Sequence, residues 1–589
     1  MSVLEVVERA LQQDTLASFI VEQWDEKKGQ RAAWEAEKRE LRNYIFATDT
    51  SKTNGNTLPW RNSTTLPKIC QIRDNLHANY ISALFPNDDW MKWEGYTLED
   101  ETKEKQDAIQ AYMSNKVRED DMRSVISKLV YDYIDYGVAQ GDVIWVNESK
   151  EDVETGEIVP GYIGPRAVRL SPLDVVFDPT ALSFEDSWKI TRTIKHLGTL
   201  ELEYGNTGDE YIKKALDRAK ETRSHLKSIT RDDFDKAGAF SVDGFGDYYT
   251  YLGSGYVEIL EFEGTMHDPD SGELLNDYII TIIDRTTLLR KEPIPAWKRN
   301  GYKVMTSWRK RPDNLYGMGP LDNLVGMQYR LDHLQNATAD ARDLTIMPPL
   351  LVKGELQEAA DWGPFARFQL DEDGDIRPLF TGANIQAMEA EIAFLMNMME
   401  EMAGAPKQAM GIRTPGEKTA FEVSSLENAA GRIFQEKTTQ FEIELLEPLL
   451  NNMLETSVRN MQGADVVRVM DDDLGVADFL EITKEDITAA GKLRPIGARH
   501  FAQQAQLMQN IVSLSNTQLW PQVSQHLSSK GLAKLTEDLL NLRRFELYGD
   551  NIALMEQIET QRLAQTAQEN LEVEQATPIE GEEDEAPLV

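Results

Sequence analysis

The chain of 589 residues is long enough for several domains, because a domain averages roughly 150 residues. It carries 62 Lys and Arg against 100 Asp and Glu, which gives a formal net charge of −38. This charge disfavours a general binder of polyanions, although an acidic protein past which DNA slides remains compatible with it. The hydrophobic share of 41% is sufficient to build cores.

Cysteine usage and hydropathy narrow the class of protein further. Cys70 is the only cysteine, which excludes an intrachain disulfide, a cysteine zinc cluster and a CxxC redox site. No apolar run approaches the roughly 18 residues of a membrane-spanning helix, and the best stretch, Tyr278–Ile283, has the length of a strand. The first residues show no basic region followed by an apolar one, so no signal peptide is predicted. We expect a cytosol-like compartment and no membrane contact.

The chain up to about residue 310 predicts a mixed α+β body. Apolar residues recur at helical spacing over the first 45 or so residues and again over Cys70–Leu84. From Gly141 onward, short apolar runs between turn residues predict strands. The predicted strands are Val143–Val146, Ala167–Leu170, Val175–Phe177, Tyr256–Phe262 and Tyr278–Ile283, with a turn over His267–Gly272 and a helix over Glu210–Leu226.

Two helices with a seven-residue apolar rhythm follow, and they bracket a short insert of strands and turns. The first, residues 319–344, ends before Pro348-Pro349, and the second spans residues 384–403. The spacing fits an ordinary helical hairpin in a core, and it equally fits a helix pair whose narrow apolar seam packs against neighbouring subunits. The series are Leu324, Met327, Leu331, Leu334, Thr338 and Ala341 in the first helix, and Ile385, Met388, Ile392, Leu395, Met399 and Met402 in the second.

The loop Gly404–Gly416 carries Lys407 and Arg413 and leads into a long helix. Thr414 is placed as its N-cap and Glu417 as the partner in a capping box. Pro448 is expected to kink or divide this helix, which otherwise continues to about Met461. Short strands over Val466–Met470 and Phe479–Ile482, helices from Arg494 to about Leu571 and an acidic tail without Lys or Arg complete the chain.

Local motifs for catalysis are not found in the sequence. Gly411–Thr419 approaches a phosphate-binding P-loop, but Glu417 is inserted before Lys418, and the motif needs a preceding strand where a helix is predicted. The seven histidines show no metal-binding spacing, and the acidic runs Asp371–Asp375 and Asp471–Asp473 lack the EF-hand pattern. We therefore expect no enzyme activity, no cofactor and no metal site.

Two aromatic groups have competing interpretations. Lys298–Arg311 contains six basic residues with Trp297 and Trp308 interleaved or adjacent, a composition that can stack on nucleic acid. A basic rim paired with acidic neighbours explains the same residues and is favoured. The Trp90–Trp93 group is expected in the core or in a subunit contact.

The order of these elements resembles that of portal proteins, the head-to-tail connectors of tailed bacteriophages, and specifically those of short-tailed phages. The resemblance lies in Tyr316–Pro320 before the first heptad helix, in the insert and the second heptad helix, and in the loop after it. It also includes Thr419–Phe434 and Leu445–Leu450, while Ser171–Pro179 is similar to a strand-and-turn segment of the family's outer body. The order matches over roughly residues 45 to 540, with motifs that are individually short.

The resemblance implies a portal fold in an α+β, largely helical chain, assembled as a ring usually of twelve subunits. The implied parts are a wing (1–318 and 417–490), two stem helices (319–344 and 384–403), a clip (345–383), a tunnel loop (404–416), a helical crown (491–571) and an acidic disordered tail (572–589). Stem packing is implied for Leu324, Met327, Leu331, Leu334, Ile385, Met388, Ile392 and Leu395. The implied DNA-facing residues of the tunnel loop are Lys407, Arg413 and Lys418.

The implied function is that of a channel at one capsid vertex of the virion, assembled in the host cytoplasm. Double-stranded DNA would pass through it without sequence readout during packaging and ejection. The implied partners are further copies of the chain, the terminase motor, the major capsid protein and scaffold, and later the tail adaptors. Another virion protein, such as a scaffold or tail component, remains an alternative, and a packaging enzyme or nuclease is the third.

Overall fold

The computed structural model describes fifteen parts of the chain. They are residues 3–46, 62, 64–86, 90–97, 103–151, 158–204, 210–221, 256–269, 271–298, 302–346, 350–353, 375–378, 385–404, 433–470 and 477–496. The chain forms two compact units, Met1–Asp465 with Glu481–Ala498, and Val466–Leu480 with Arg499–Val589. The described residues of the second unit belong to two strands, β14 (Asp465–Met470) and β15 (Ala477–Ile482), which pair with each other.

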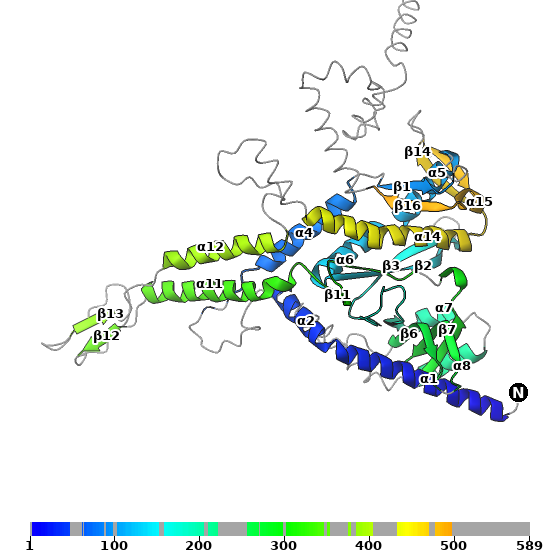
Figure 1. The fold of residues 1–589 in the computed structure, drawn as a ribbon, viewed down its shortest axis with the longest axis horizontal. Coiled ribbons are helices and arrows are strands. Elements are labelled where there is room, and N and C mark those ends of the chain that lie inside the picture. The colour runs from blue at the N-terminus through cyan, green and yellow to red at the C-terminus, as the bar shows by residue number, and fades with distance from the viewer. Residues whose placement is uncertain are drawn as a thin grey trace, which may run out of the picture. The chain divides into compact units, whose positions relative to one another are not determined.

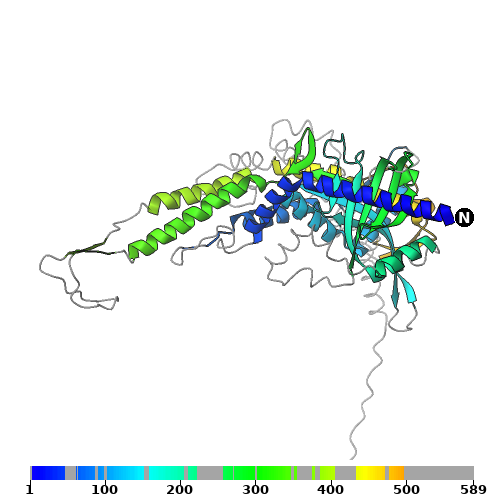
Figure 2. The ribbon, with the colours of Figure 1, turned by 90° about the horizontal axis from the view of Figure 1, so that it is seen from below.

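A five-stranded antiparallel sheet with helices on both faces forms one half of the first unit. Because successive residues of a strand point to opposite faces, Leu260 and Ile282 pack under helix α1 (Val3–Gln30), whereas Ile259 and Ile283 pack under two shorter helices. Figure 2 shows α1 crossing the strands. The strands, in sheet order, are β4 (Val175–Phe177), β5 (Lys189–His196), β6 (Tyr256–His267), β7 (Leu274–Ile283) and β8 (Thr287–Pro293), and the shorter helices are α7 (Leu197–Tyr204) and α8 (Glu210–Glu221).

The predicted strands of this sheet and the turn between the last two of them are confirmed. β4 has the predicted bounds and β6 and β7 are longer than predicted, whereas β5 and β8 were not predicted. The turn between β6 and β7 is closed by the Gly272 N–H, which donates to the Asp268 carbonyl at 3.0 Å. Gly272 has a φ of +67°, a value that glycine adopts without strain. The predicted helix from Glu210 is described as far as Glu221.

A second, three-stranded sheet in the order β3-β2-β9 forms the rest of the body, and helices α6 and α14 pack against β2 and β3. The apolar spacing discussed above did not single out α5 or α6. The strands are β2 (Val138–Glu151), β3 (Ile158–Leu170) and β9 (Val304–Ser307), and the helices are α5 (Lys103–Glu119), α6 (Met122–Asp135) and α14 (Glu447–Asn460). Around them lie α2 (Ala32–Phe46), α4 (Lys68–Leu84), α15 (Lys484–Ile487), the strands β10 (Arg309–Arg311) and β11 (Asn314–Met318), and a short turn of helix, Ala296–Lys298.

Strand β1 (Met91–Gly95) pairs antiparallel with β16 (Gly491–Pro495). This pairing corrects two expectations, a helix from Arg494 and a crown that begins at residue 491. The physical reason is tertiary: Leu493 is fully buried against the rest of the first unit, and the Trp93 ring covers Gly491 so closely that a Cβ there would lie 2.4 Å from it. Trp90 and Trp93 are both buried, which confirms the core interpretation of that group.

The helix through Pro448 is continuous, so a division of the helix at this residue is not borne out. Residues 433–441 are helical, Glu442–Leu446 form a π-helical turn, and α14 follows directly with Pro448 as its second residue. Proline cannot donate the N–H of an interior helical bond, and a π-helical turn is one of the irregularities that accompany it. The helix ends at Asn460, next to the expected Met461.

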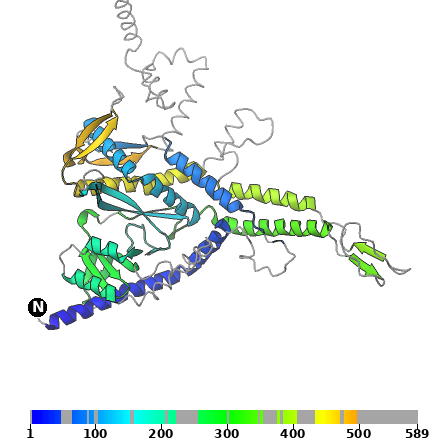
Figure 3. The same ribbon diagram turned by 180° about the vertical axis from the view of Figure 1, so that it is seen from behind.

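The two heptad helices form an antiparallel hairpin. A single 3₁₀ turn (Asp322–Leu324) leads into α11 (Val325–Ile346), and α12 (Ile385–Met402) returns beside it. Between them, β12 (Leu350–Lys353) pairs antiparallel with β13 (Asp375–Pro378). Figures 1 and 3 show the helices side by side, with the β12–β13 pair at the end away from the strand-rich body.

Both helices and the strand pair were predicted, and the regular α-helix starts six residues later than the expected residue 319. The chain is thus a mixed helix-and-strand, α+β protein. Several expectations lie outside the described residues: the tunnel loop beyond Gly404, the capping box at Thr414, the crown beyond residue 496, and the tail at 572–589.

Candidate functional site: the helical hairpin

One face of α11 is buried within the chain itself. Leu331 is fully buried and Leu334 is 4% exposed, and Met327 is the half-buried member of the predicted series. This face packs on α12 and, towards its start, on α2 and α4. The buried members of the predicted series are Leu324, Leu331, Leu334, Thr338 and Ala341.

The facing side of α12 is covered less completely. The four predicted packing residues Ile385, Met388, Ile392 and Leu395 are half-buried, and only Met399 of that series is fully buried. Met402, the last of the series, is 45% exposed, and the neighbouring Ala403 is buried instead. A straight helix drifts by about 20° per heptad against a strict seven-residue repeat, which turns Met402 out of the seam.

Another face of α12 exposes large apolar side chains. Phe394 is 60% exposed, Met398 is 37% exposed and Met402 is 45% exposed, and they follow one another at a spacing of four residues. Residues at this spacing lie on one side of a helix. We call these three residues the α12 stripe. The heptad pattern missed Phe394 and Met398 because they lie outside its positions, although their spacing of four is visible in the sequence.

Two ion pairs join the two helices across the surface. Arg330 Nη2 lies 2.9 Å from Glu391 Oε1, and Arg342 pairs with Glu389. All four side chains are about half exposed, so water screens both pairs. Exposed pairs of this kind contribute about 0–1 kcal/mol each.

The start of the hairpin, by contrast, is fixed by a buried lysine. Lys38 on α2 places Nζ 2.5 and 2.6 Å from the two carboxylate oxygens of Asp322. Asp322 Oδ2 also accepts a hydrogen bond from the Gly319 N–H at 2.8 Å. Burial lowers the pKa of Lys38, and the Asp322 carboxylate opposes that shift. Lys38 of α2 thereby fixes Asp322, the first residue of the 3₁₀ turn that leads into α11.

Two glycines let the backbones meet at this point. A Cβ on Gly319 would lie 2.5 Å from the Ile134 carbonyl oxygen, and a Cβ on Gly137 would lie 2.3 Å from the Gly319 nitrogen. Gly137 has a φ of +71° and its carbonyl accepts the Trp308 N–H at 2.9 Å. No larger residue fits here without backbone movement, so the start of the hairpin is locked to the end of α6.

A run of hydrogen bonds then holds the segment before α4 along α11. Gln328 Nε2 donates to the Leu66 carbonyl at 2.6 Å and to Asp332 Oδ1 at 2.8 Å, and the Leu66 N–H donates to the same carboxylate at 3.0 Å. Further out, Asn62 donates to Asp340 at 2.9 Å. Burial raises the pKa of Asp332 to about 6, while the two donors act in the opposite direction.

The end of α12 is tied to the same place by a buried ion pair. Lys68 at the start of α4 contacts Glu400 near the end of α12, and the two side chains are 5% and 7% exposed. The Lys38–Asp322 bonds, the glycine contact, the Gln328–Asp332 bonds and the Lys68–Glu400 pair together define what we call the hairpin root.

Two of the six basic residues at 298–311, Lys303 and Lys310, pair with acidic neighbours. Lys303 is buried and its Nζ lies 2.9 Å from Glu263 and 3.3 Å from Glu261, and these carboxylates raise its pKa against the opposing effect of burial. Lys310 pairs with Glu444 in the π-helical turn before α14. The interpretation as a basic rim is confirmed for these two lysines, and Arg299 lies outside the described residues.

The proposed DNA-facing residues Lys407, Arg413 and Lys418 lie outside the described residues, as does the P-loop-like segment. Within the parts of the chain that the structure describes, no group of three or more His, Cys, Asp or Glu could hold a metal ion. Among the same residues, no helix is both long and apolar enough to cross a membrane.

No protein-family model matches the chain, and no curated protein sequence matches it.

Proposed function

We propose that this chain is the subunit of a viral portal, a closed ring around a channel for double-stranded DNA. The observation that carries the proposal is the hairpin of α11 and α12. It begins from a tightly fixed root, carries a β-strand pair at its far end and exposes the α12 stripe. In this proposal α11 and α12 are the stem, and the β12–β13 pair is the clip that meets the terminase and later the tail adaptors.

The α12 stripe supports assembly because exposed apolar side chains in a row are commonly covered in an interface. In a cyclic assembly each copy presents one surface to the next and receives another in return, so a closed ring leaves no stripe uncovered. On the α11 side, the seam between α11 and α12 is largely buried within the chain, and on the α12 side it is half-buried. The stripe, and not the heptad seam, is therefore the surface that we assign to the neighbouring copy.

The negative net charge of the chain supports a channel through which DNA moves more than a site that binds DNA tightly. Twelve copies at −38 each would carry −456 formal charges. A lumen of that sign repels phosphate and leaves no deep well in which DNA would stall, whereas a basic lumen would hold DNA through release of counterions. Contacts from Lys407, Arg413 and Lys418 stay a prediction, and they would touch the backbone without reading sequence.

Electron microscopy of the purified protein, together with an ATP hydrolysis assay, tests this proposal against the alternatives. We expect closed rings with a central hole and no ATP turnover above background. A scaffold or tail component would give filaments, shells or solid oligomers. ATP turnover that disappears in Lys418→Ala would favour a packaging enzyme. Either of these results, or single chains at all concentrations, would contradict the portal proposal.

A further inference from the structure

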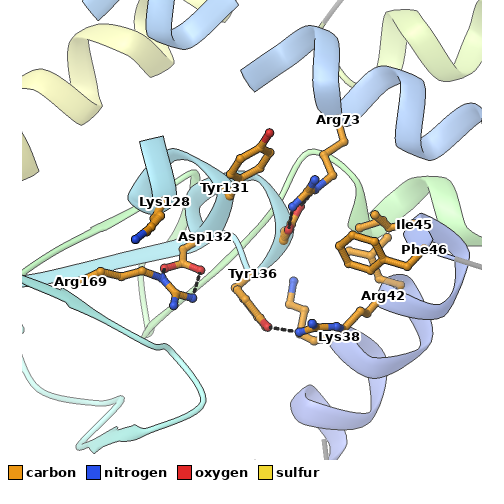
Figure 4. A pocket seen from close by; sticks show the side chains of 12 residues that line it. Lys38, Arg42, Ile45, Phe46, Arg73, Lys128, Tyr131, Asp132, Tyr136 and Arg169 are labelled. Atoms are coloured by element: carbon orange, nitrogen blue, oxygen red, sulfur yellow. Dashed lines mark hydrogen bonds and ion pairs between the residues drawn. The ribbon is translucent and has the colours of Figure 1, made fainter. Parts of the chain in front are cut away.

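A small pocket in the first unit has a basic lining in an otherwise acidic chain. Helices α2, α4 and α6 and strand β3 contribute its walls, and its volume is about 200 Å³ (Figure 4). Five lining residues are lysines or arginines and two are aspartates, which leaves three formal positive charges in excess. The whole chain, by comparison, carries −38. This local reversal of charge has no part in the assembly proposed above.

The two aspartates of the lining are already occupied. Asp132 accepts from Arg169 Nε at 2.5 Å and from Nη2 at 2.6 Å. Asp135 accepts from Arg73 Nε and Nη2, both at 2.7 Å. Two-point pairs of this kind match the guanidinium and carboxylate groups in both charge and geometry. The aspartates therefore pair with two of the five cations of the lining.

Arg42 and Lys128 are the cations that remain. Lys38 is engaged with Asp322 at the hairpin root. Arg42 Nη1 donates to the hydroxyl oxygen of Tyr136 at 3.4 Å, and this partner is uncharged. Among the described residues, no carboxylate pairs with Arg42 or with the exposed Lys128. The pocket thus brings two uncompensated positive charges to one cavity.

Tyr136 supplies a neutral donor between them. Burial raises the pKa of Tyr136 to about 12, so the phenol keeps its proton at neutral pH. Its oxygen accepts from Arg42, and no described residue accepts its proton. Figure 4 shows Tyr136 with Arg42 and Lys38 on one side and with Lys128 and Arg169 on the other. A hydroxyl donor between cations suits a ligand with several acceptor oxygens.

We propose that this pocket binds a small oxyanion of the phosphate type, held by charge-assisted hydrogen bonds from Arg42 and Lys128 and by the Tyr136 hydroxyl. Pockets for drug-sized ligands start at about 300 Å³, so this cavity is smaller than they are and a single phosphate group fits it. Such a group comes either from the free ion or from the backbone of a nucleic acid.

Calorimetric titration of the full-length protein with inorganic phosphate, at constant ionic strength and neutral pH, measures this binding. We expect saturation at one ion per chain. A charge-assisted hydrogen bond contributes about 1.5–3 kcal/mol, so removing one should weaken binding at least about tenfold. We expect that loss in Arg42→Gln and in Lys128→Gln, and a larger loss in the double variant. Lys214→Gln on α8, whose side chain is 74% exposed, is the matched control and should bind as the wild type does.

Lys128 is exposed and has no described partner, so Lys128→Gln should keep the fold, which circular dichroism checks. Absence of saturable binding in the wild type, or unchanged affinity in a folded Lys128→Gln variant, would overturn the proposal. A short DNA duplex added as competitor separates the two sources. Displacement of bound phosphate identifies a backbone phosphate as a ligand of the pocket, and retention identifies the free ion.

Discussion

The buried contacts at the root of the helical hairpin and the exposed contacts on its surface hold it by different means. At the root, Lys68 and Glu400 form a pair that water hardly reaches, and two glycine backbones touch. On the surface, the side chains of the ion pairs Arg330–Glu391 and Arg342–Glu389 are about half exposed, and the α12 stripe is open to water. The root contacts are complete within one chain, whereas the surface of the hairpin leaves apolar side chains for a partner to cover.

This difference separates two kinds of change. Changes to the buried root contacts should affect folding of the single chain, and changes to the exposed α12 stripe should affect association. The heptad residues Leu331 and Leu334 belong with the root in this respect, because both are buried within the chain. Replacing them with Asp would unfold the hairpin and would not test assembly.

The largest effect is expected from Gly319→Ala. Its Cβ would lie 2.5 Å from the Ile134 carbonyl oxygen, and backbone atoms cannot move aside as a side chain can. We expect a loss on the order of 3 kcal/mol or more in the free energy of unfolding, measured by chemical denaturation. Gly326→Ala is the matched control, because nothing lies within 4 Å of its added Cβ. That variant should be more stable than wild type by about 0.5–1 kcal/mol, and equal effects of the two changes would contradict the proposed contact.

The next effect concerns the buried pair at the root. Lys68→Met removes the buried cation that contacts the Glu400 carboxylate. Breaking a buried pair in this way costs about 3–5 kcal/mol, and chemical denaturation measures it. The double variant Lys68→Met with Glu400→Leu should recover most of the loss, because both members of the ion pair are then replaced by apolar side chains. If the double variant were as unstable as the single one, the loss would not come from breaking this pair.

A pH-dependent effect of intermediate size is expected for Asp332. Its pKa of about 6 in the folded chain lies above the value of about 3.9 expected after unfolding. The folded chain therefore holds the proton more tightly, so this group stabilises the fold at low pH and that contribution is lost as the pH rises from about 4 to 6. Asp332→Asn lacks this titration.

The stability of Asp332→Asn relative to wild type should therefore rise by about 2–3 kcal/mol between these limits, at about 1.4 kcal/mol per pKa unit. Denaturation of both proteins over a series of pH values measures the difference. A difference that stays constant with pH would show that Asp332 does not titrate in this range.

The smallest effect is expected for an exposed ion pair on the surface of the hairpin. Arg342→Gln removes a pair whose two side chains are 50% and 52% exposed, and it should lower the free energy of unfolding by less than about 1 kcal/mol. Added salt should abolish even this difference, since it screens exposed charges. A loss of stability as large as that of Lys68→Met would contradict the proposed difference between buried root contacts and exposed surface pairs.

The hairpin could be predicted from the sequence because its signal is local. A seven-residue rhythm and flanking prolines lie within one stretch of chain, and both helices are present. The root could not be predicted in this way, since Lys68 and Glu400 are separated by 332 positions and Lys38 and Asp322 by 284. The sequence around each of these residues contains no signal that identifies a partner so far away in the chain.

The strand Gly491–Pro495 could not be predicted from the sequence for the same reason. Its local sequence is short and ends in a proline, and its pairing with Met91–Gly95 depends on an edge far away in the chain. The α12 stripe was not predicted from the sequence for another reason. Phe394 and Met398 follow the helical period, but they do not occupy the heptad positions from which the apolar seam was predicted. A full helical projection of residues 385–402 would have found them.

The single most direct measurement is the particle mass of the wild-type protein beside the double variant Phe394→Ser with Met398→Ser, both checked by circular dichroism. We predict a uniform wild-type particle of about twelve chains, in line with closed cyclic symmetry. The folded double variant should collapse to single chains or small oligomers, because the surface assigned to the neighbour has lost its apolar side chains. An unchanged particle mass in the variant, or a wild-type protein found only as single chains, would contradict assembly through the α12 stripe.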